Sequence, residues 1–276
     1  MNKEGIIVKI ISNLYTVLCE DETIECRASG KIRNDKIIPV VGDFVVFDYK
    51  EKYIKKILDR KNYLHRPPVS NVDVALIVTS VKSPNLSLNL LDKQIALVGL
   101  NKIEPVICLT KLDLLDDDES KNIDMIRSYY SNVGFKVFDN NQIEEMKSYL
   151  KNKVVVLTGQ TGAGKSSLIN RISPELNLKT DEISKALGRG KHTTRHTEIF
   201  NIDGVFFVDT PGFSSLELRV EKDRLKEVYP EFVGSNCKYK NCNHDRENIC
   251  EVKEKVKNGE ILKSRYENYI KFRGEL

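Results

Sequence analysis

The sequence has no apolar run long enough to cross a membrane, and Lys9 interrupts the only apolar stretch near the start before a signal-peptide core could form. The sequence also lacks a large excess of charge of either sign, because it contains 44 Lys and Arg and 40 Asp and Glu. Such a small surplus permits nucleic-acid binding without indicating it. Internal repeats and low-complexity tracts are absent. These absences exclude a membrane protein and leave an ordinary soluble globular chain, which we expect in the cytoplasm.

Cysteine is sparse, and three of the six cysteines are bunched near the C-terminus. This distribution indicates a metal site in a reducing compartment and not a disulfide framework. The bunched residues form a C-x4-C-x-H-x5-C pattern with three thiolates and one imidazole, the four ligands of a closed, structural zinc site. The predicted zinc ligands are Cys237, Cys242, His244 and Cys250. The other three, Cys19, Cys26 and Cys108, lie in strand-like runs and are interpreted as small core residues.

The first 65 residues show five short strand patterns separated by turn residues, at residues 5–11, 14–18, 22–27, 44–49 and 53–58. Five short strands in a small unit predict a closed or nearly closed barrel of the OB-fold type. A polar, basic loop at residues 27–36 fits either a solvated hairpin or an RNA-contacting loop. Arg66-Pro67-Pro68 then predicts an extended linker, since paired prolines hold the chain extended.

After the linker, strand and helix patterns alternate. Strands are predicted at residues 72–79, 105–109, 135–138 and 154–158, with helices at 88–100, 118–130 and 143–150 between them. Buried, non-alternating strands joined by helices predict a parallel sheet covered on both faces. From residue 214 the chain becomes charged and helical. The sequence therefore predicts three domains: a barrel at residues 1–65, an α/β domain at 66–216 and a mainly helical, zinc-binding domain at 217–276.

A phosphate-binding loop follows the strand at 154–158. The pattern G-x-x-x-x-G-K-[ST] is met between Gly159 and Ser166, and a helix pattern follows it, which is the context that the motif requires. Glycines let backbone N–H groups curl around phosphates, and the start of the helix adds favourable partial charge. Lys165 is expected to reach the β- and γ-phosphates, and the Ser166 hydroxyl to bind Mg²⁺.

A magnesium and γ-phosphate segment is expected downstream. A strand pattern delivers Asp209 to the sequence Asp-Thr-Pro-Gly, in which Asp209 is predicted to hold Mg²⁺ and the Gly212 N–H to contact the γ-phosphate. Thr193 and Thr194 are both candidates for completing the magnesium shell; the sequence does not separate them, and Thr194 is preferred. Many GTPases have a water-orienting Gln after this Gly, but Phe213 occupies that position here and cannot hydrogen-bond.

His192 is the nearest side chain that could orient the attacking water instead, as a neutral imidazole. The alternative is that His192 is a polar loop residue without a catalytic role. Lys165 and His192 are the predicted catalytic residues.

The element that would recognise guanine, Thr110-Lys111-Leu112-Asp113, lies upstream of the phosphate loop. The Asp113 carboxylate can accept hydrogen bonds from guanine N1–H and from its exocyclic amine, neither of which adenine offers. Thr110 replaces the usual Asn of this motif and supplies one hydroxyl in place of an amide. The reversed order of the motifs predicts a circularly permuted GTPase domain.

The predicted nucleotide-binding residues are Thr110, Lys111, Asp113, Gly159, Gln160, Thr161, Gly162, Ala163, Gly164, Lys165, Ser166, Ser167 and Gly212, and the predicted magnesium ligands are Ser166, Thr193, Thr194 and Asp209. A second base-contacting loop is expected near residues 139–141.

Taken together, the permuted order, the residues from Gly190 to Thr194, Phe213 and the zinc pattern closely resemble the RsgA family (also called YjeQ or YloQ), bacterial GTPases that assist assembly of the small ribosomal subunit. The resemblance covers nearly the whole chain. It implies an OB-fold, a permuted GTPase domain and a zinc domain that dock on ribosomal RNA. It also implies GTP hydrolysis to GDP and phosphate that the subunit stimulates, and His192 matches the catalytic histidine proposed for the family. We expect a monomer with Mg²⁺ and GTP and one structural zinc.

Two alternatives stay open at this point. One is an RNA-binding module in which GTP is a structural ligand and hydrolysis is negligible. The other is a P-loop nucleotide kinase, although Asp113, Asp209 and Gly212 argue against it.

Overall fold

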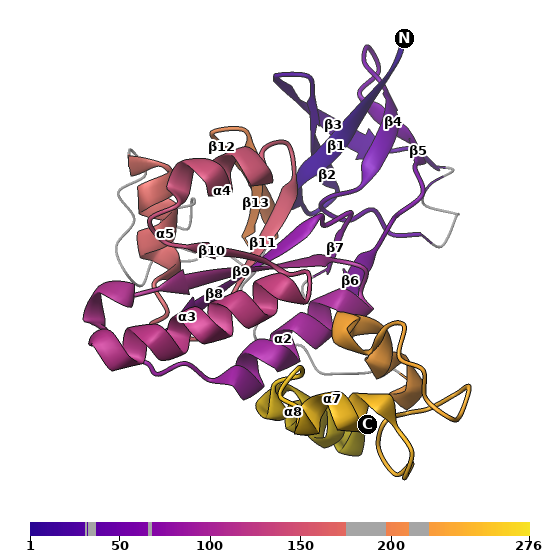
Figure 1. The fold of residues 1–276 in the computed structure, drawn as a ribbon. Coiled ribbons are helices and arrows are strands. Elements are labelled where there is room, and N and C mark those ends of the chain that lie inside the picture. The colour runs from indigo at the N-terminus through magenta and orange to yellow at the C-terminus, as the bar shows by residue number, and fades with distance from the viewer. Residues whose placement is uncertain (31, 33–36, 66–67, 175–196, 210–220) are drawn as a thin grey trace. The chain divides into compact units, whose positions relative to one another are not determined.

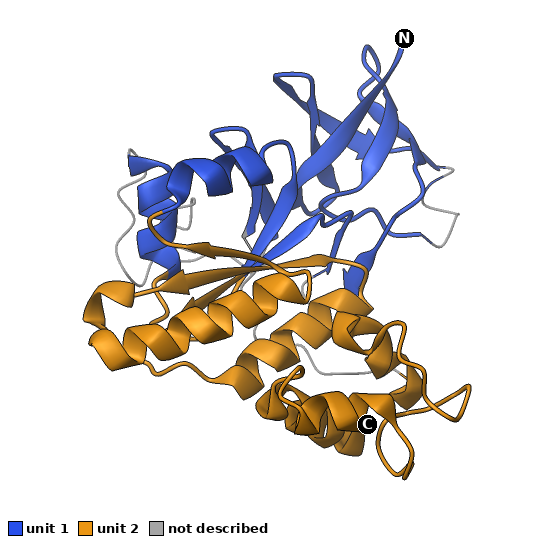
Figure 2. Ribbon diagram, viewed as in Figure 1, with its two compact units in different colours: residues 1–76, 142–157, 165–215 blue, residues 77–141, 158–164, 216–276 orange. Residues whose placement is uncertain are grey.

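The computed structural model describes residues 1–30, 32, 37–65, 68–174, 197–209 and 221–276. The chain divides into two compact units (Figure 2): unit 1 comprises residues 1–76, 142–157 and 165–215, and unit 2 comprises residues 77–141, 158–164 and 216–276. The division does not follow the chain order, since each unit is assembled from three separate segments. Within the described residues, none of the helices combines the length and the apolar character that a membrane span requires.

Unit 1 begins with a closed five-stranded barrel, formed by β1 (Asn2–Ile11), β2 (Leu14–Cys19), β3 (Glu22–Ala28), β4 (Phe44–Asp48) and β5 (Tyr53–Ile57) (Figure 1). The strands pair in the order β1-β2-β3-β5-β4, and β4 pairs back onto β1, with Ile6 opposite Phe44. Alternate side chains fill the interior, because successive residues of a strand point to opposite faces. Ile7, Val17, Cys26 and Phe47 are fully buried. The predicted barrel is confirmed, and Cys19 and Cys26 lie in its core.

A short β-hairpin flanks the predicted linker. Strands β6 (Tyr63–His65) and β7 (Pro68–Ser70) pair antiparallel, with His65 opposite Pro68. The barrel's fully buried Asp43 accepts hydrogen bonds from the Arg60 side chain at 2.7 and 2.8 Å and from the Ser70 hydroxyl at 2.6 Å. A buried carboxylate stays charged at low cost only when cationic and hydrogen-bonding partners surround it. The hairpin is thus fixed to the barrel, which proline content alone does not predict.

The rest of unit 1 belongs to the α/β domain. Strands β11 (Val154–Thr158) and β13 (Val205–Asp209) are parallel, and β12 (Glu198–Ile202), which the sequence pattern did not predict, pairs antiparallel with β13. Helices α4 (Ile143–Leu150) and α5 (Lys165–Ile172) also belong to unit 1. The last residue of β11, Thr158, belongs to unit 2. Asp73, just before strand β8 (Val74–Ser80), exchanges hydrogen bonds with Val154 at 2.7 and 2.8 Å.

Unit 2 contains strands in the order β10-β9-β8, where β9 is Glu104–Thr110 and β10 is Lys136–Asp139, and β9 and β10 are parallel. Helix α2 (Leu88–Leu100) packs on β9 and α3 (Asp117–Asn132) on β10. Ser87 caps α2, and Asp116 and Glu119 form a capping box at the start of α3. The predicted parallel α/β arrangement is confirmed, and Cys108 is fully buried in β9.

The C-terminal part of unit 2 is mainly helical. It contains two 3₁₀ segments, η4 (Lys222–Val228) and η5 (Pro230–Phe232), and two helices, α7 (Glu251–Lys257) and α8 (Lys263–Glu275) (Figure 1). Its aromatic core packs against α2, where Tyr229, Phe232 and Tyr269 form a cluster with Leu100. Tyr269 is buried in this cluster, and Tyr266, one turn earlier on α8, packs against it.

Candidate functional site

The end of strand β9 positions the predicted guanine-reading segment. Thr110 is the last residue of β9 and is buried, and its hydroxyl donates a hydrogen bond to the carbonyl oxygen of Ala163 at 2.6 Å. Lys111 has a left-handed backbone with a φ of 63°, and its ammonium donates to the carbonyl oxygen of Ser83. The exposed Asp113 follows in the 3₁₀ turn η1 (Leu112–Leu114). Although 53 residues separate Thr110 from Ala163 in the chain, the structure brings the predicted base reader next to the predicted phosphate loop.

The expected second base-contacting loop lies beside the same strand end. The Asn140 N–H donates to the carbonyl oxygen of Leu109 at 3.0 Å, and the Asn141 N–H donates to the Asp139 carboxylate at 2.8 Å. This places residues 139–141 next to Thr110 at the carboxyl end of two parallel strands, where open α/β sheets bind ligands.

The phosphate loop requires glycine at its first position. Gly159 has a φ of 139°, and a Cβ atom there would lie 2.1 Å from the carbonyl oxygen of Val78, which no side chain tolerates. Gly162 and Gly164 also have positive φ values, 79° and 91°. The loop starts from Thr158, whose hydroxyl accepts a hydrogen bond from the Gln94 amide at 3.1 Å. Gln94 does not belong to any of the predicted motifs. The only feature of the sequence that could have pointed to it is that a polar residue lies within a helix of mostly apolar residues.

The chain leaves unit 2 at Gly164 and enters helix α5 of unit 1 with Lys165. Burial lowers the pKa of the Lys165 ammonium, because desolvation disfavours the charged form. An anionic ligand would offset that effect. Ser166 is buried in the first turn of α5, whereas Ser167 is exposed.

Asp209 is the final residue of β13, opposite Glu198 of β12. The predicted residues His192, Thr193, Thr194 and Gly212 lie outside the described residues.

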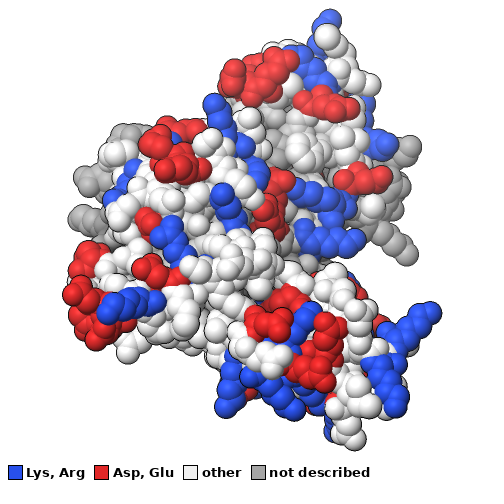
Figure 3. Space-filling view, in the orientation of Figure 1, with Lys and Arg blue, Asp and Glu red and all other residues white. Residues whose placement is uncertain are grey.

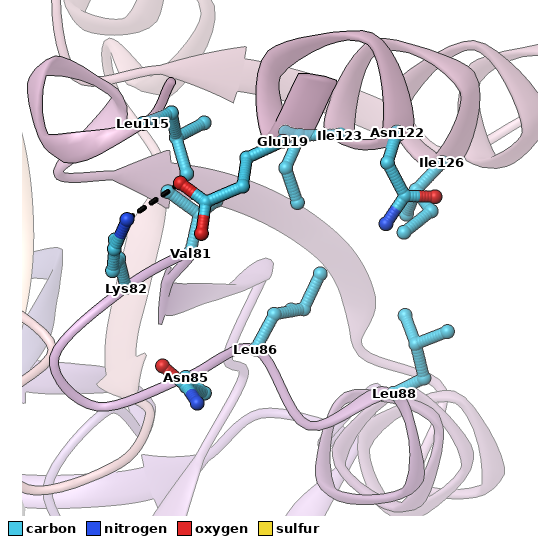
Figure 4. A pocket seen from close by; sticks show the side chains of 10 residues that line it. All are labelled: Val81, Lys82, Asn85, Leu86, Leu88, Leu115, Glu119, Asn122, Ile123 and Ile126. Carbon is cyan, nitrogen blue, oxygen red and sulfur yellow. Dashed lines mark hydrogen bonds and ion pairs between the residues drawn. The ribbon is translucent and has the colours of Figure 1, made fainter. Parts of the chain in front are cut away.

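A pocket of about 300 Å³ in unit 2 lies between residues 81–88 and helix α3 (Figure 4). Leu86, Leu88 and Ile123 supply apolar walls, and Lys82 forms an ion pair with Glu119 at 2.5 Å. The two charges neutralise each other, and none of the predicted nucleotide-binding residues lines this pocket. We therefore do not place the nucleotide there.

The four predicted zinc ligands converge in the C-terminal part of unit 2, with their ligand atoms within 4.8 Å of one another. The Cys237 and Cys250 sulfurs are 3.8 Å apart, and the His244 Nδ1 lies 3.6 Å from Cys237 Sγ and 3.3 Å from Cys250 Sγ. Tetrahedral zinc with Zn–S bonds of about 2.3 Å and Zn–N bonds of about 2.0 Å needs S···S and N···S separations of about 3.8 and 3.5 Å. The donor set and its spacing therefore fit a zinc ion.

The residues around these ligands hold them in place. The Tyr266 and Tyr269 hydroxyls donate to the carbonyl oxygens of His244 and Asn243 at 2.6 and 2.7 Å. Burial raises the pKa of the Cys242 thiol to about 12 and also raises that of Cys250. These two thiols stay protonated at neutral pH without a nearby cation, whereas a bound metal would favour thiolates and release their protons.

Comparison with known proteins matches two family models to this chain: the RsgA N-terminal domain at residues 4–54 and the RsgA GTPase at residues 57–219. The chain belongs to the RsgA GTPase family. It is 45% identical, over 99% of its length and 95% of the relative's, to the small ribosomal subunit biogenesis GTPase RsgA of Enterococcus faecalis. Its identity to the RsgA of Bacillus subtilis is 43%, covering 99% of this chain and 97% of the relative.

Two solved RsgA-type structures share the fold. The crystal structure of YloQ, a circularly permuted GTPase, matches with a TM-score of 0.85 and 38% identity, covering 100% of this chain and 95% of that one. YjeQ from Thermotoga maritima matches with a TM-score of 0.87 and 37% identity, covering 100% and 99%. The predicted fold class is confirmed: an N-terminal barrel, a circularly permuted GTPase domain and a C-terminal Cys/His cluster. As an RsgA GTPase the chain is a GTP hydrolase, which decides against both alternatives that the sequence left open.

Proposed function

We propose that this GTPase binds the small ribosomal subunit and assists its assembly, and that it does so as a monomer in the cytoplasm. The proposal is supported by its relatives, which are named small ribosomal subunit biogenesis GTPases. The main support for the proposed nucleotide site is the hydrogen bond from the Thr110 hydroxyl to the carbonyl oxygen of Ala163, because it joins the proposed guanine-reading segment to the proposed phosphate loop. The domain limits expected at residues 65/66 and 216/217 belong to the same proposal, supported by family models that cover 4–54 and 57–219.

Each predicted residue has a chemical role in this proposal. Asp113 accepts hydrogen bonds from guanine, and the backbone between Gly159 and Gly164 surrounds the phosphates. Lys165 contacts the β- and γ-phosphates, and Ser166 with Asp209 supplies the oxygen ligands that Mg²⁺ prefers. A magnesium ion held by these residues would neutralise the charge that develops on the phosphates. His192 orients the attacking water, and Thr193 or Thr194, together with Gly212, senses the γ-phosphate.

Zinc is proposed as the ion held by Cys237, Cys242, His244 and Cys250. These four residues are a complete protein set, so the site is structural and holds the C-terminal module folded. Figure 3 shows basic side chains gathered over part of this module's surface, and residues 219–276 carry 14 Lys and Arg against 11 Asp and Glu. The excess is small, but such side chains support a contact with the phosphates of ribosomal RNA.

The nucleotide and the subunit are tested separately. Calorimetry on the metal-loaded protein should give binding of GTP and GDP and none of ATP, and Asp113→Ala should remove the preference for guanine. Equal affinity for adenine nucleotides would contradict the assignment of the base reader. Phosphate release should rise when purified small subunits are added.

Small subunits should also capture the protein more tightly with a non-hydrolysable GTP analogue than with GDP, because Gly212, the proposed γ-phosphate contact, lies only a few residues before the C-terminal module in the chain. Equal capture with both nucleotides would contradict the proposed switch.

A further inference from the structure

Helix α2 contains two buried polar side chains among buried residues that are otherwise apolar. Asp92 is fully buried and Gln94 is 6% exposed. Residues two positions apart on a helix point in very different directions, so these two side chains meet different partners. A buried polar group costs free energy unless it is hydrogen-bonded, and both are. The two contacts are therefore specific features of the helix.

Gln94 contacts the start of the phosphate loop. Its Nε2 donates to the hydroxyl of Thr158 at 3.1 Å, and Thr158 is only 3% exposed. The next residue is Gly159, whose backbone lies so close to the Val78 carbonyl that no Cβ would fit. Thr158 and Gly159 are thus held by α2 through a side-chain hydrogen bond and by β8 through backbone packing. The backbone that leads into the loop has little freedom to move.

Asp92 fixes α2 itself. Its carboxylate accepts hydrogen bonds from Arg265 at 2.7 Å and from Asn268 at 2.6 Å, both on α8, and from the Tyr130 hydroxyl of α3 at 2.6 Å. Asn89, one turn earlier on α2, donates to Asn268 at 2.6 Å. Helix α2 is therefore bound to two other helices and provides Gln94 with a rigid support.

From these contacts we propose that Gln94 is a positioning residue for GTP binding and hydrolysis, which fixes the entry of the phosphate loop through Thr158. This inference rests on the proposed role of residues 159–166 in binding the phosphates. Gln94 does not belong to the set expected to touch the nucleotide. It acts by keeping the loop's N–H groups where the phosphates of GTP and GDP need them, since small displacements of a binding group cost affinity.

The test uses the full-length, metal-loaded protein and the variants Gln94→Leu, Thr158→Val and the double variant. Each removes the hydrogen bond with little change of volume. Because one hydrogen bond changes an equilibrium constant about five-fold, each single variant should weaken the affinity for both GDP and GTP by about that factor. The double variant should be no weaker than either single one, since the two side chains act as one unit. The control is Lys93→Ala on the same helix, which removes an ion pair with Glu275 and a 6.0 Å contact of the ammonium with the Phe272 ring, touches neither Gln94 nor Thr158, and should bind like the wild type.

Nucleotide affinity, measured by titration of a fluorescent GDP, separates positioning from a merely structural role. Loss of packing alone would lower the melting temperature and leave the dissociation constant of the folded molecules unchanged. If Gln94→Leu fails to fold, Thr158→Val carries the test, because it removes only a hydroxyl. Wild-type affinity in both variants, within two-fold, would overturn the inference and leave the proposed function intact. Absence of guanine-nucleotide binding in the wild type would instead overturn the proposed function.

Discussion

The C-terminal module contains a fully buried cation, and replacing it should destabilise the protein strongly. Arg265 is fully buried and forms ion pairs at 2.7 Å with Asp92 and with Glu231, which are 0% and 3% exposed. Its guanidinium also lies 4.2 Å from the centre of the Tyr229 ring. Arg265→Met keeps most of the side-chain length and removes the charge. Two buried carboxylates would then share one site with no cation.

The expected loss is large because breaking a buried ion pair by removing one partner costs about 3–5 kcal/mol. We expect about 4 kcal/mol for Arg265→Met at pH 7, a substantial part of a typical stability of about 5–15 kcal/mol. Asp92→Asn should cost less, about 1–2 kcal/mol, since Arg265 keeps Glu231 and the two remaining charges balance. Removing Arg265 should therefore cost more free energy than removing the charge of Asp92. The first change leaves two buried negative charges without a cation, whereas the second leaves one cation paired with one anion.

The loss should depend on pH with a definite sign. Burial already raises the pKa of Asp92 in the wild type, against the opposing effect of Arg265. Without Arg265 the folded-state pKa of Asp92 should rise further above its unfolded value of about 4. A carboxyl with a raised folded pKa contributes stability below its unfolded pKa and loses it as pH rises through the folded pKa. The defect should therefore be small near pH 4–5 and complete at pH 7.

Urea unfolding followed by circular dichroism measures this effect, and the chain has no Trp to serve as a fluorescent probe. Arg224→Met is the matched control, because Arg224 forms an exposed ion pair with Glu227 in the same module and should cost less than about 1 kcal/mol. If Arg265→Met were no more costly than this control at pH 7, or equally costly at pH 5 and pH 7, the charge argument would be wrong.

Four further substitutions probe the sites. Thr110→Val leaves the carbonyl of the phosphate loop without its donor and should weaken guanine-nucleotide binding about five-fold in a titration. Gly159→Ala should abolish binding in the same assay while the zinc content stays normal, because the new Cβ would meet the Val78 carbonyl at 2.1 Å. Cys250→Ser should lower zinc measured by elemental analysis from one per chain and reduce the melting temperature, and unchanged zinc would exclude it as a ligand. His192→Ala should slow phosphate release and leave nucleotide affinity nearly intact; unchanged turnover would remove His192 from the mechanism.

Local chemistry made much of this protein predictable. The motifs assigned to the phosphate loop, the base reader and the zinc site are short, and the ligands proposed for them dictate their residue types and spacing. The five barrel strands and the alternating strands and helices follow from hydrophobic periodicity, which is also local. Two elements escaped this reasoning. Strand β12 is short and mixed in polarity, and the hairpin of β6 and β7 is stabilised by partners such as Asp43, far from it in sequence.

The amino-acid sequence alone thus determined the class of the protein, the permuted order of its motifs and the four members of its Cys/His cluster. Only the tertiary structure decided that β4 closes the barrel onto β1, that Thr110 bonds to Ala163, that Gln94 supports Thr158, and that Arg265 neutralises Asp92 from 173 residues away. The reason is physical. A motif encodes its ligand in neighbouring residues, whereas a buried hydrogen bond between distant segments exists only because packing has already removed both groups from water.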